Sequence, residues 1–250
     1  MRVQVLPCGG AVPGHPLTGF LVDGVLAVDA GPLGTFGSVA QQAAIRDVLL
    51  THSHIDHVAG LPVFLDTVYR MADPPPTVHA TRATHDALRR DLFNDRLMPD
   101  FFALSERLPP FVTARDVVPD RPFAVGAYTV TPIQLDHAVP TVGYLIEDRT
   151  SAVAILTDTG PVPEVITSLT HWPRLKAVFL ECSYPRRMTD LAAVTKHQTT
   201  DQFAEAARAF PKSVRVLATH VKPRYHSDVR TELNELGFAI GEPGQTVEAV

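Results

Sequence analysis

Residues 51–60 constrain the fold of this chain more than any other segment. They contain three histidines and one aspartate, and they directly follow an apolar run that favours a buried strand. His52 and His54 stand two positions apart, so an extended segment places both on one face. Asp56 and His57 follow where the chain turns. Packing explains a lone histidine but gives no reason for this spacing. Because imidazole and carboxylate suit Zn²⁺, Mn²⁺ or Fe²⁺, the segment predicts a metal site after a strand.

The composition excludes several other classes of protein. A chain of 250 residues can bury a sizeable core, and 45% hydrophobic with 20% charged residues is typical of a soluble globular protein. No apolar run approaches the ~20 residues of a membrane helix, and the first residues do not form a secretory signal, so a cytoplasmic location is expected. Cys8 and Cys182 form no CxxC pair, which excludes a thiolate zinc ribbon. A net charge of -5 argues against a general nucleic-acid binder.

Apolar runs and amphipathic segments alternate along the whole chain, separated by Pro- and Gly-rich breaks. Without an internal repeat or a clear linker, we expect one domain over residues 1–250. Strands followed by helices in two successive halves predict a sheet sandwich covered by helices. The expected strands are residues 2–6, 18–22, 25–29, 45–50, 77–80, 123–135 as one or two strands, 142–147, 152–156, 177–181 and 214–218. The expected helices are residues 58–69, 81–93, 161–169, 199–210 and 227–236.

The run of residues 51–60 resembles the HxHxDH signature of the metallo-β-lactamase fold superfamily. The resemblance continues, because later His and Asp residues follow expected strands in the order of that family. It implies an α/β (α+β) fold, an αββα sandwich of two mixed sheets covered by helices. It also implies two divalent metals, most readily Zn with Mn or Fe as alternatives. The implied ligands are His52, His54 and His137 for one metal, Asp56, His57 and His220 for the other, and Asp158 as the bridge between them.

Three further segments are similar to class II 3′,5′-cyclic-nucleotide phosphodiesterases. Residues 84–101 carry the FN and MPDF elements of one family block, residues 179–184 resemble an E-C-S-(F/Y) segment, and residues 218–223 resemble a T-H-x-K-P segment. This resemblance implies hydrolysis of cyclic AMP, cyclic GMP or both to 5′-nucleotides by a metal-bound hydroxide. The partner is then a small cyclic nucleotide, with no polymeric nucleic acid and no membrane, and the family implies a homodimer.

The same resemblance implies two catalytic side chains. His197 matches an additional histidine of the family and is expected to be the general acid, and Asp56 is expected to orient the nucleophile. The pattern also departs from the family. Lys196-His197-Gln198-Thr199 stands where a Gly-His-Leu-type motif is usual, and Met98 replaces a common Trp. An exposed position beside a helix start is the alternative interpretation of His197.

The main alternative function is a tRNA 3′-processing endonuclease, whose motifs resemble residues 137–144, residues 158–159 and residues 223–225. That enzyme has a Gly-rich basic arm. Here residues 61–125 contain no glycine, and residues 66–122 carry eight arginines, no lysine and nine acidic residues. Binding RNA through phosphates requires a cationic surface, which this segment does not offer. A metal-free binding protein of the same fold and a glyoxalase-type thioesterase are further alternatives.

Several other residues keep two interpretations each. Lys222 is expected to contact phosphate or to be a solvated charge, and Cys182 to be a small packed residue. Four aromatic residues are expected to stack on a base or to lie in the core: Phe101, Phe102, Tyr144 and Tyr184. Five histidines fall outside the predicted site: His15, His79, His85, His171 and His226.

Overall fold

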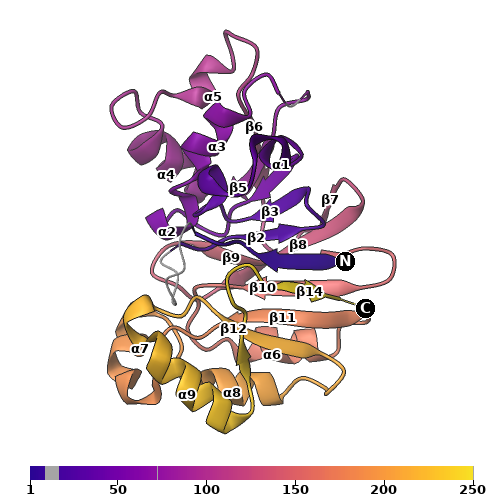
Figure 1. The fold of residues 1–250 in the computed structure, drawn as a ribbon, viewed down its shortest axis with the longest axis vertical. Helices are drawn as coiled ribbons and strands as arrows, with labels where there is room; N and C mark the ends of the chain where they lie inside the picture. Colours follow the sequence, from indigo (N-terminus) through magenta and orange to yellow (C-terminus); the bar gives the residue numbers. More distant parts are fainter. Residues whose placement is uncertain (9–16, 72, 250) are drawn as a thin grey trace. The chain divides into compact units, whose positions relative to one another are not determined.

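A computed structural model describes residues 1–8, 17–71 and 73–249 (Figure 1). The described chain divides into two compact units. The N-terminal unit comprises residues 2–8, 17–71 and 73–118, and the C-terminal unit comprises Met1 and residues 119–249. The expectation of one domain over residues 1–250 remains a prediction. Within these described ranges, no helix is both long and apolar enough to cross a membrane.

The N-terminal unit contains a mixed sheet with strand order β1-β2-β3-β4-β5-β6. The first three strands pair antiparallel, and the pairs from β3 to β6 are parallel. The strands are β1 (Arg2–Val5), β2 (Phe20–Val22), β3 (Leu26–Val28), β4 (Asp47–Leu49), β5 (Thr77–Thr81) and β6 (Thr113–Val117).

The helices of the N-terminal unit are short and begin at recognisable signals. Ser38 and Gln41 form a capping box, and the Thr81 hydroxyl accepts a hydrogen bond from the backbone of Thr84. The helical segments are η1 (Leu33–Thr35), α1 (Val39–Ala43), α2 (Ile55–Val58), α3 (Leu61–Thr67), α4 (Arg82–Ala87), the π-helical turn η2 (Leu88–Leu92) and α5 (Phe101–Leu104). Apolar residues of α3 and α5 pack with those of β4 and β5 in one core.

The C-terminal unit contains a second mixed sheet, with strand order β13-β12-β11-β10-β9-β8-β7. Pairs from β7 to β10 are antiparallel, and pairs from β10 to β13 are parallel. All five residues of β10 are buried, as expected for a strand covered on both faces. The strands of this sheet are β7 (Phe123–Val125), β8 (Tyr128–Leu135), β9 (Thr141–Glu147), β10 (Ala152–Leu156), β11 (Leu175–Glu181), β12 (Arg215–Thr219) and β13 (Ala239–Ile240). A last strand, β14 (Thr246–Glu248), is not part of this sheet.

Helices α6, α8 and α9 cover one face of this second sheet, where their apolar residues form a common core (Figure 1). Helix α8 begins at a capping box of Thr199 and Gln202. Helix α9 ends at Gly237, whose positive φ of 82° suits glycine. The helical segments are α6 (Pro163–Thr170), η3 (Arg186–Met188), α7 (Thr189–Thr195), α8 (Thr200–Arg208), η4 (Pro223–Tyr225) and α9 (His226–Leu236).

In both units, an antiparallel set of strands leads into a parallel set. Loops at the carboxyl ends of parallel strands converge at one edge of a sheet, which is where such folds place their functional side chains. Asp29 and His52 follow β3 and β4, and Asp158 and His220 follow β10 and β12. The topology therefore gathers the polar residues singled out by sequence at one strand edge within each unit.

Candidate metal centre

The N-terminal unit brings together its four predicted ligands after β4. The His52 ring lies 4.6 Å from the His54 ring and 4.2 Å from the His57 ring, measured between centroids. Nε2 of His57 lies 3.9 Å from the Asp56 carboxylate. His52 and His57 are completely buried. The loop after β4 and the first turn of α2 thus gather three imidazoles and one carboxylate.

Asp29 holds this loop in place, although its sequence position did not single it out. Its buried carboxylate lies 2.7 Å from Nδ1 of His57 and accepts hydrogen bonds from the Thr51 backbone N–H at 2.8 Å and the Thr51 hydroxyl at 2.9 Å. Since a carboxylate only accepts, Nδ1 of His57 donates. Nδ1 of His52 lies 3.0 Å from the Thr51 hydroxyl. Asp29 therefore fixes His57 directly and His52 through Thr51.

Two glycines allow the Asp29 turn to approach α2 closely. A Cβ on Gly31 would lie 2.2 Å from the Asp56 carbonyl oxygen, and a Cβ on Gly60 would lie 2.6 Å from that of Ala30. The backbone N–H of Ala30 donates to the His57 carbonyl at 2.7 Å. A side chain at either glycine would separate these backbones, so the two glycines are required for the ligand loop to close.

The C-terminal unit places its two predicted histidine ligands, His137 and His220, beside the buried carboxylate of Asp158. Nε2 of His137 lies 3.6 Å from Oδ2 of Asp158, and Nε2 of His220 lies 3.1 Å from Oδ1. Asp158 has a φ of 56° and His220 a φ of 58°, in the left-handed region that is uncommon for residues other than glycine. Asp158 thus presents one oxygen to each of two imidazoles, and its role as a bridge between metals stays a prediction.

His197 joins this group. Its ring stacks on that of His220 at 5.4 Å, and one ligand atom each of Asp158, His197 and His220 lie within 4.8 Å of one another. Nδ1 of His197 lies 2.9 Å from the buried Glu181 carboxylate at the end of β11 and therefore donates to it. Burial opposes protonation of His197, but the hydrogen bond and charge of Glu181 outweigh it, so the pKa of His197 is raised. His197 is buried, so the interpretation as an exposed residue is wrong.

The histidines of both units share one pattern of support. Nδ1 of His137 lies 3.1 Å from the Lys196 carbonyl oxygen, and Nδ1 of His220 lies 3.2 Å from the Ser183 hydroxyl, which itself donates to Glu181 at 2.8 Å. Together with His52, His57 and His197, these imidazoles engage the protein through Nδ1. Metal-binding histidines are commonly fixed in this way, with Nε2 directed to the metal. The donor set therefore fits divalent metals that prefer imidazole and carboxylate.

The burial of the four aromatic residues and of Lys222 distinguishes between their two interpretations. Phe101, Phe102 and Tyr144 are buried in the cores of their units, so the core interpretation holds for them. Tyr184 is buried, and its ring centroid lies 5.9 Å from that of His197 in an edge-to-face arrangement. Lys222 is half-buried and its charge opposes protonation of His197, so it is not a fully solvated charge.

The structure also describes Cys182 and four of the five histidines outside the predicted site. Cys182 is a buried free cysteine whose pKa is raised by burial, as expected of a packed residue. His15 lies outside the described residues, and His171 is exposed. Three histidines away from the ligand groups pair with carboxylates instead, namely His79 with Asp47, His85 with Asp116 and His226 with Glu242.

Sequence comparison identifies the superfamily. A family profile described as "Beta-lactamase superfamily domain" matches residues 20–221. The chain therefore belongs to the β-lactamase superfamily, and the predicted metallo-β-lactamase fold, with two mixed sheets and helices, is confirmed. The fold of the metallo-β-lactamases usually binds divalent metals.

Relatives within the superfamily have different names. A "Probable 3′,5′-cyclic-nucleotide phosphodiesterase" of Yersinia pestis is 27% identical over 229 residues, covering 80% of this chain and 64% of the relative. A "Nuclear ribonuclease Z" of Triticum aestivum is 27% identical over 142 residues, covering 54% of this chain and 76% of the relative. The chain thus spans less than two thirds of the Yersinia relative's length.

Among solved structures, unliganded yeast PDE1 superposes with a TM-score of 0.74 at 16% identity, covering 99% of this chain and 98% of that chain. This similarity establishes the shared fold. The resemblance to cyclic-nucleotide phosphodiesterases is thus borne out by named relatives, alongside relatives named ribonuclease Z.

Proposed function

We propose that this protein is a phosphodiesterase that hydrolyses 3′,5′-cyclic nucleotides to 5′-nucleotides. We further propose that His52, His54, Asp56, His57, His137, Asp158 and His220 together hold two divalent metals, with zinc the expected ion. The support is the Nδ1 pattern of the histidines within each unit and the position of Asp158 between two Nε2 atoms. Divalent metals bound there would polarise a phosphoryl oxygen and lower the pKa of a water molecule.

The observation that carries the proposal is the buried His197–Glu181 pair beside Asp158. Cleavage at the 3′ position expels a sugar alkoxide, a poor leaving group that needs a proton. Glu181 holds Nδ1 of His197, so Nε2 is the atom that donates that proton. A thioester expels a thiolate, which needs no such donor. The pair therefore favours phosphodiester over thioester hydrolysis.

His197 has a competing role as a third ligand beside Asp158 and His220. The two roles differ in an observable way. Removing a general acid leaves metal content intact and slows the reaction, whereas removing a ligand lowers metal content. We assign His197 to proton donation because it matches the additional histidine of the resembled family, outside the seven implied ligands, and the Glu181 carboxylate would stabilise its protonated ring.

The second candidate is an RNA-cleaving phosphodiesterase, which the wheat relative named ribonuclease Z favours. The same chemistry serves both substrates, so the choice depends on the binding surface. Residues 66–122 carry more acidic than basic residues, and three of the arginines already lie on acidic or aromatic partners: Arg82, Arg89 and Arg90. A polyanion therefore gains little from this segment.

The test is a substrate comparison with zinc- or manganese-loaded protein. Cyclic AMP, cyclic GMP, a tRNA precursor and a thioester are incubated in parallel, and products are separated by chromatography. The proposal expects a 5′-monophosphate from at least one cyclic nucleotide and slow or absent cleavage of the other substrates. Preferred cleavage of the tRNA precursor would instead establish the second candidate.

A further inference from the structure

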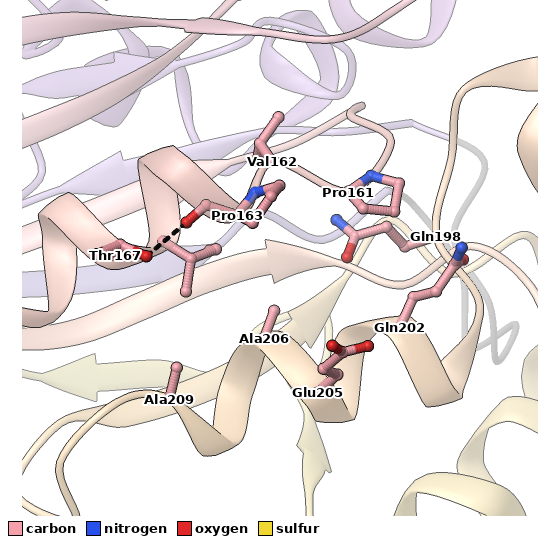
Figure 2. Close-up of a pocket in the computed structure, with 10 residues that line it drawn as sticks. Pro161, Val162, Pro163, Thr167, Gln198, Gln202, Glu205, Ala206 and Ala209 are labelled. Atoms are coloured by element: carbon pink, nitrogen blue, oxygen red, sulfur yellow. Dashed lines mark hydrogen bonds between the residues drawn. The ribbon is translucent and has the colours of Figure 1, made fainter.

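A cavity of about 330 Å³ lies in the C-terminal unit between α6 and α8 (Figure 2). This volume is within the ~300–1,000 Å³ typical of small-molecule sites. Its lining includes Pro161, which stands three positions after Asp158, and Gln198, which directly follows His197.

The walls of this cavity are apolar and contain two proline rings. Pro161, Val162 and Pro163 come from the start of α6, and Ala206 faces them from α8 (Figure 2). Ile166 also lines the cavity and is buried. Rings and small aliphatic groups on opposite sides form a slot that suits a flat heterocycle better than a charged or branched ligand.

Polar groups lie on the α8 side of the slot (Figure 2). Gln198 is almost fully buried, with 1% of its surface exposed, and its Nε2 donates to the Thr159 carbonyl at 3.3 Å. Within the described chain, no hydrogen bond is made by its Oε1 or by its second amide hydrogen. Glu205 adds a carboxylate without a partner in the described residues, and Gln202 uses its Oε1 to cap α8.

A primary amide with one acceptor and one donor still available pairs with the edge of adenine, which offers an amino donor beside a ring-nitrogen acceptor. Gln198 is the residue in this slot with that pair, and Glu205 can accept the second amino hydrogen. We propose that the cavity is a nucleobase subsite that takes an aminopurine, an inference that rests on the proposed function for its link to cyclic nucleotides.

Gln198 also connects the cavity to the ligand group. Its backbone carbonyl accepts from the N–H groups of Ser183 at 3.0 Å and Tyr184 at 3.2 Å. Ser183 contacts Glu181 and His220, and Thr159 follows Asp158. Two sources fit this placement, namely the base of the substrate itself and a separate adenine nucleotide that acts on the same residues.

Binding of adenosine to the metal-loaded protein, followed by NMR, tests the subsite directly. We expect intermolecular NOEs from the adenine protons to the methyl groups of Ile166 and Ala206. Purine riboside, which lacks the amino group, is expected to bind about tenfold more weakly, as loss of one buried hydrogen-bond partner predicts. Absence of these NOEs, or equal binding of the two nucleosides, would overturn the proposal.

Substitutions in the slot provide a second test of adenosine binding. Ala206→Phe fills the slot and is expected to abolish adenosine binding, and Gln198→Leu, which keeps a similar volume, is expected to weaken it about tenfold. Asp201→Asn is the matched control, because Asp201 is an exposed carboxylate on α8 outside the cavity and its loss is expected to leave binding unchanged. Near-native methyl spectra would show that each variant folds. Unaltered adenosine binding in both slot variants would refute the subsite.

Steady-state kinetics distinguish the two sources of the base, namely the substrate itself and a separate adenine nucleotide. If the substrate supplies the base, adenosine inhibits cyclic AMP hydrolysis competitively, and Gln198→Leu raises KM more than it lowers kcat. If a second nucleotide binds, adenosine changes turnover without competing. If adenosine binds in the slot but no cyclic nucleotide is hydrolysed, the subsite is retained and the proposed function is rejected. If a cyclic nucleotide is hydrolysed but adenosine does not bind in the slot, the proposed function is retained and the subsite is rejected.

Discussion

Nδ1 of His57 lies 2.7 Å from Oδ2 of Asp29, and both side chains are completely buried. The same carboxylate receives the backbone N–H and the hydroxyl of Thr51, so one acidic group fixes the start and the end of the histidine loop. Asp29 stands 28 residues before His57, with a φ of 59° at the turn after β3. Its position is therefore part of the ligand geometry of the N-terminal unit.

Replacing Asp29 tests whether this support matters for metal affinity. Asp29→Asn keeps the size of the side chain but removes its charge and half of its acceptor capacity. We expect metal affinity to fall by about 10–100-fold, the usual effect of losing a group that orients a ligand. Competition with a chelator measures this change. Asp47→Asn, which alters the similar His79–Asp47 pair away from the loop, should leave metal affinity unchanged, and equal effects of both variants would contradict the assignment.

His197→Ala tests the assignment of the general acid. Loss of a positioned proton donor is expected to lower kcat for a cyclic nucleotide by ~10²–10⁴-fold while metal content stays the same. A p-nitrophenyl phosphodiester has a good leaving group that needs no proton, so its hydrolysis should be much less affected. Loss of bound metal in this variant would show that His197 is a ligand instead.

Glu181→Gln tests how Glu181 acts through His197. The amide still accepts from Nδ1, but it no longer stabilises a positive ring, so the reaction should slow in the same leaving-group-dependent way. Because both groups serve one proton transfer, the double variant should be no slower than His197→Ala alone. Additive losses of rate would indicate that Glu181 supports the fold by a separate route.

Lys196 has a φ of 53° and presents its carbonyl oxygen to Nδ1 of His137. Glycine adopts this conformation freely, whereas a β-branched residue does so at a cost. We expect Lys196→Gly to be more stable than Lys196→Val by about 1–2 kcal/mol in denaturant unfolding, with metal binding retained in the glycine variant. The exposed pair with Asp136 is lost in both variants and so cancels in the comparison. Equal stabilities would show that this conformation carries no strain.

Elements with strong local signals were predictable from sequence. The bounds of β10 match the expected residues 152–156, because a short run of five apolar residues, too brief for a typical helix, favours a buried strand. Helix α8 follows the expected Thr199 cap. In contrast, β6 was missed because four of its five residues are exposed, which hides the apolar pattern of a strand.

Two expected helices are broken in the structure. The expected helix 58–69 becomes α2 and α3, divided at Gly60, where the close approach of Ala30 is a tertiary effect. The expected helix 81–93 continues from α4 into the π-helical turn η2, a change of helix type with no clear sequence signal.

The predicted ligands could be found from the order of residue types, but their supports could not. Asp29 and Glu181 meet His57 and His197 across 28 and 16 residues, contacts that depend on strand pairing. Glu181 carried a partial signal, since it lies in the segment that resembles the E-C-S-(F/Y) block. An acidic residue at the end of an apolar strand, as at Asp29 and Glu181, is the pattern that could have identified both.

The most direct test of the account is the product formed from a cyclic nucleotide by protein carrying about two divalent metals per chain, analysed by phosphorus NMR in ¹⁸O-labelled water. The account predicts a 5′-monophosphate with one solvent oxygen, and loss of this product in Asp158→Ala. A 3′-monophosphate, or no turnover of cyclic AMP or cyclic GMP with both metals bound, would contradict it.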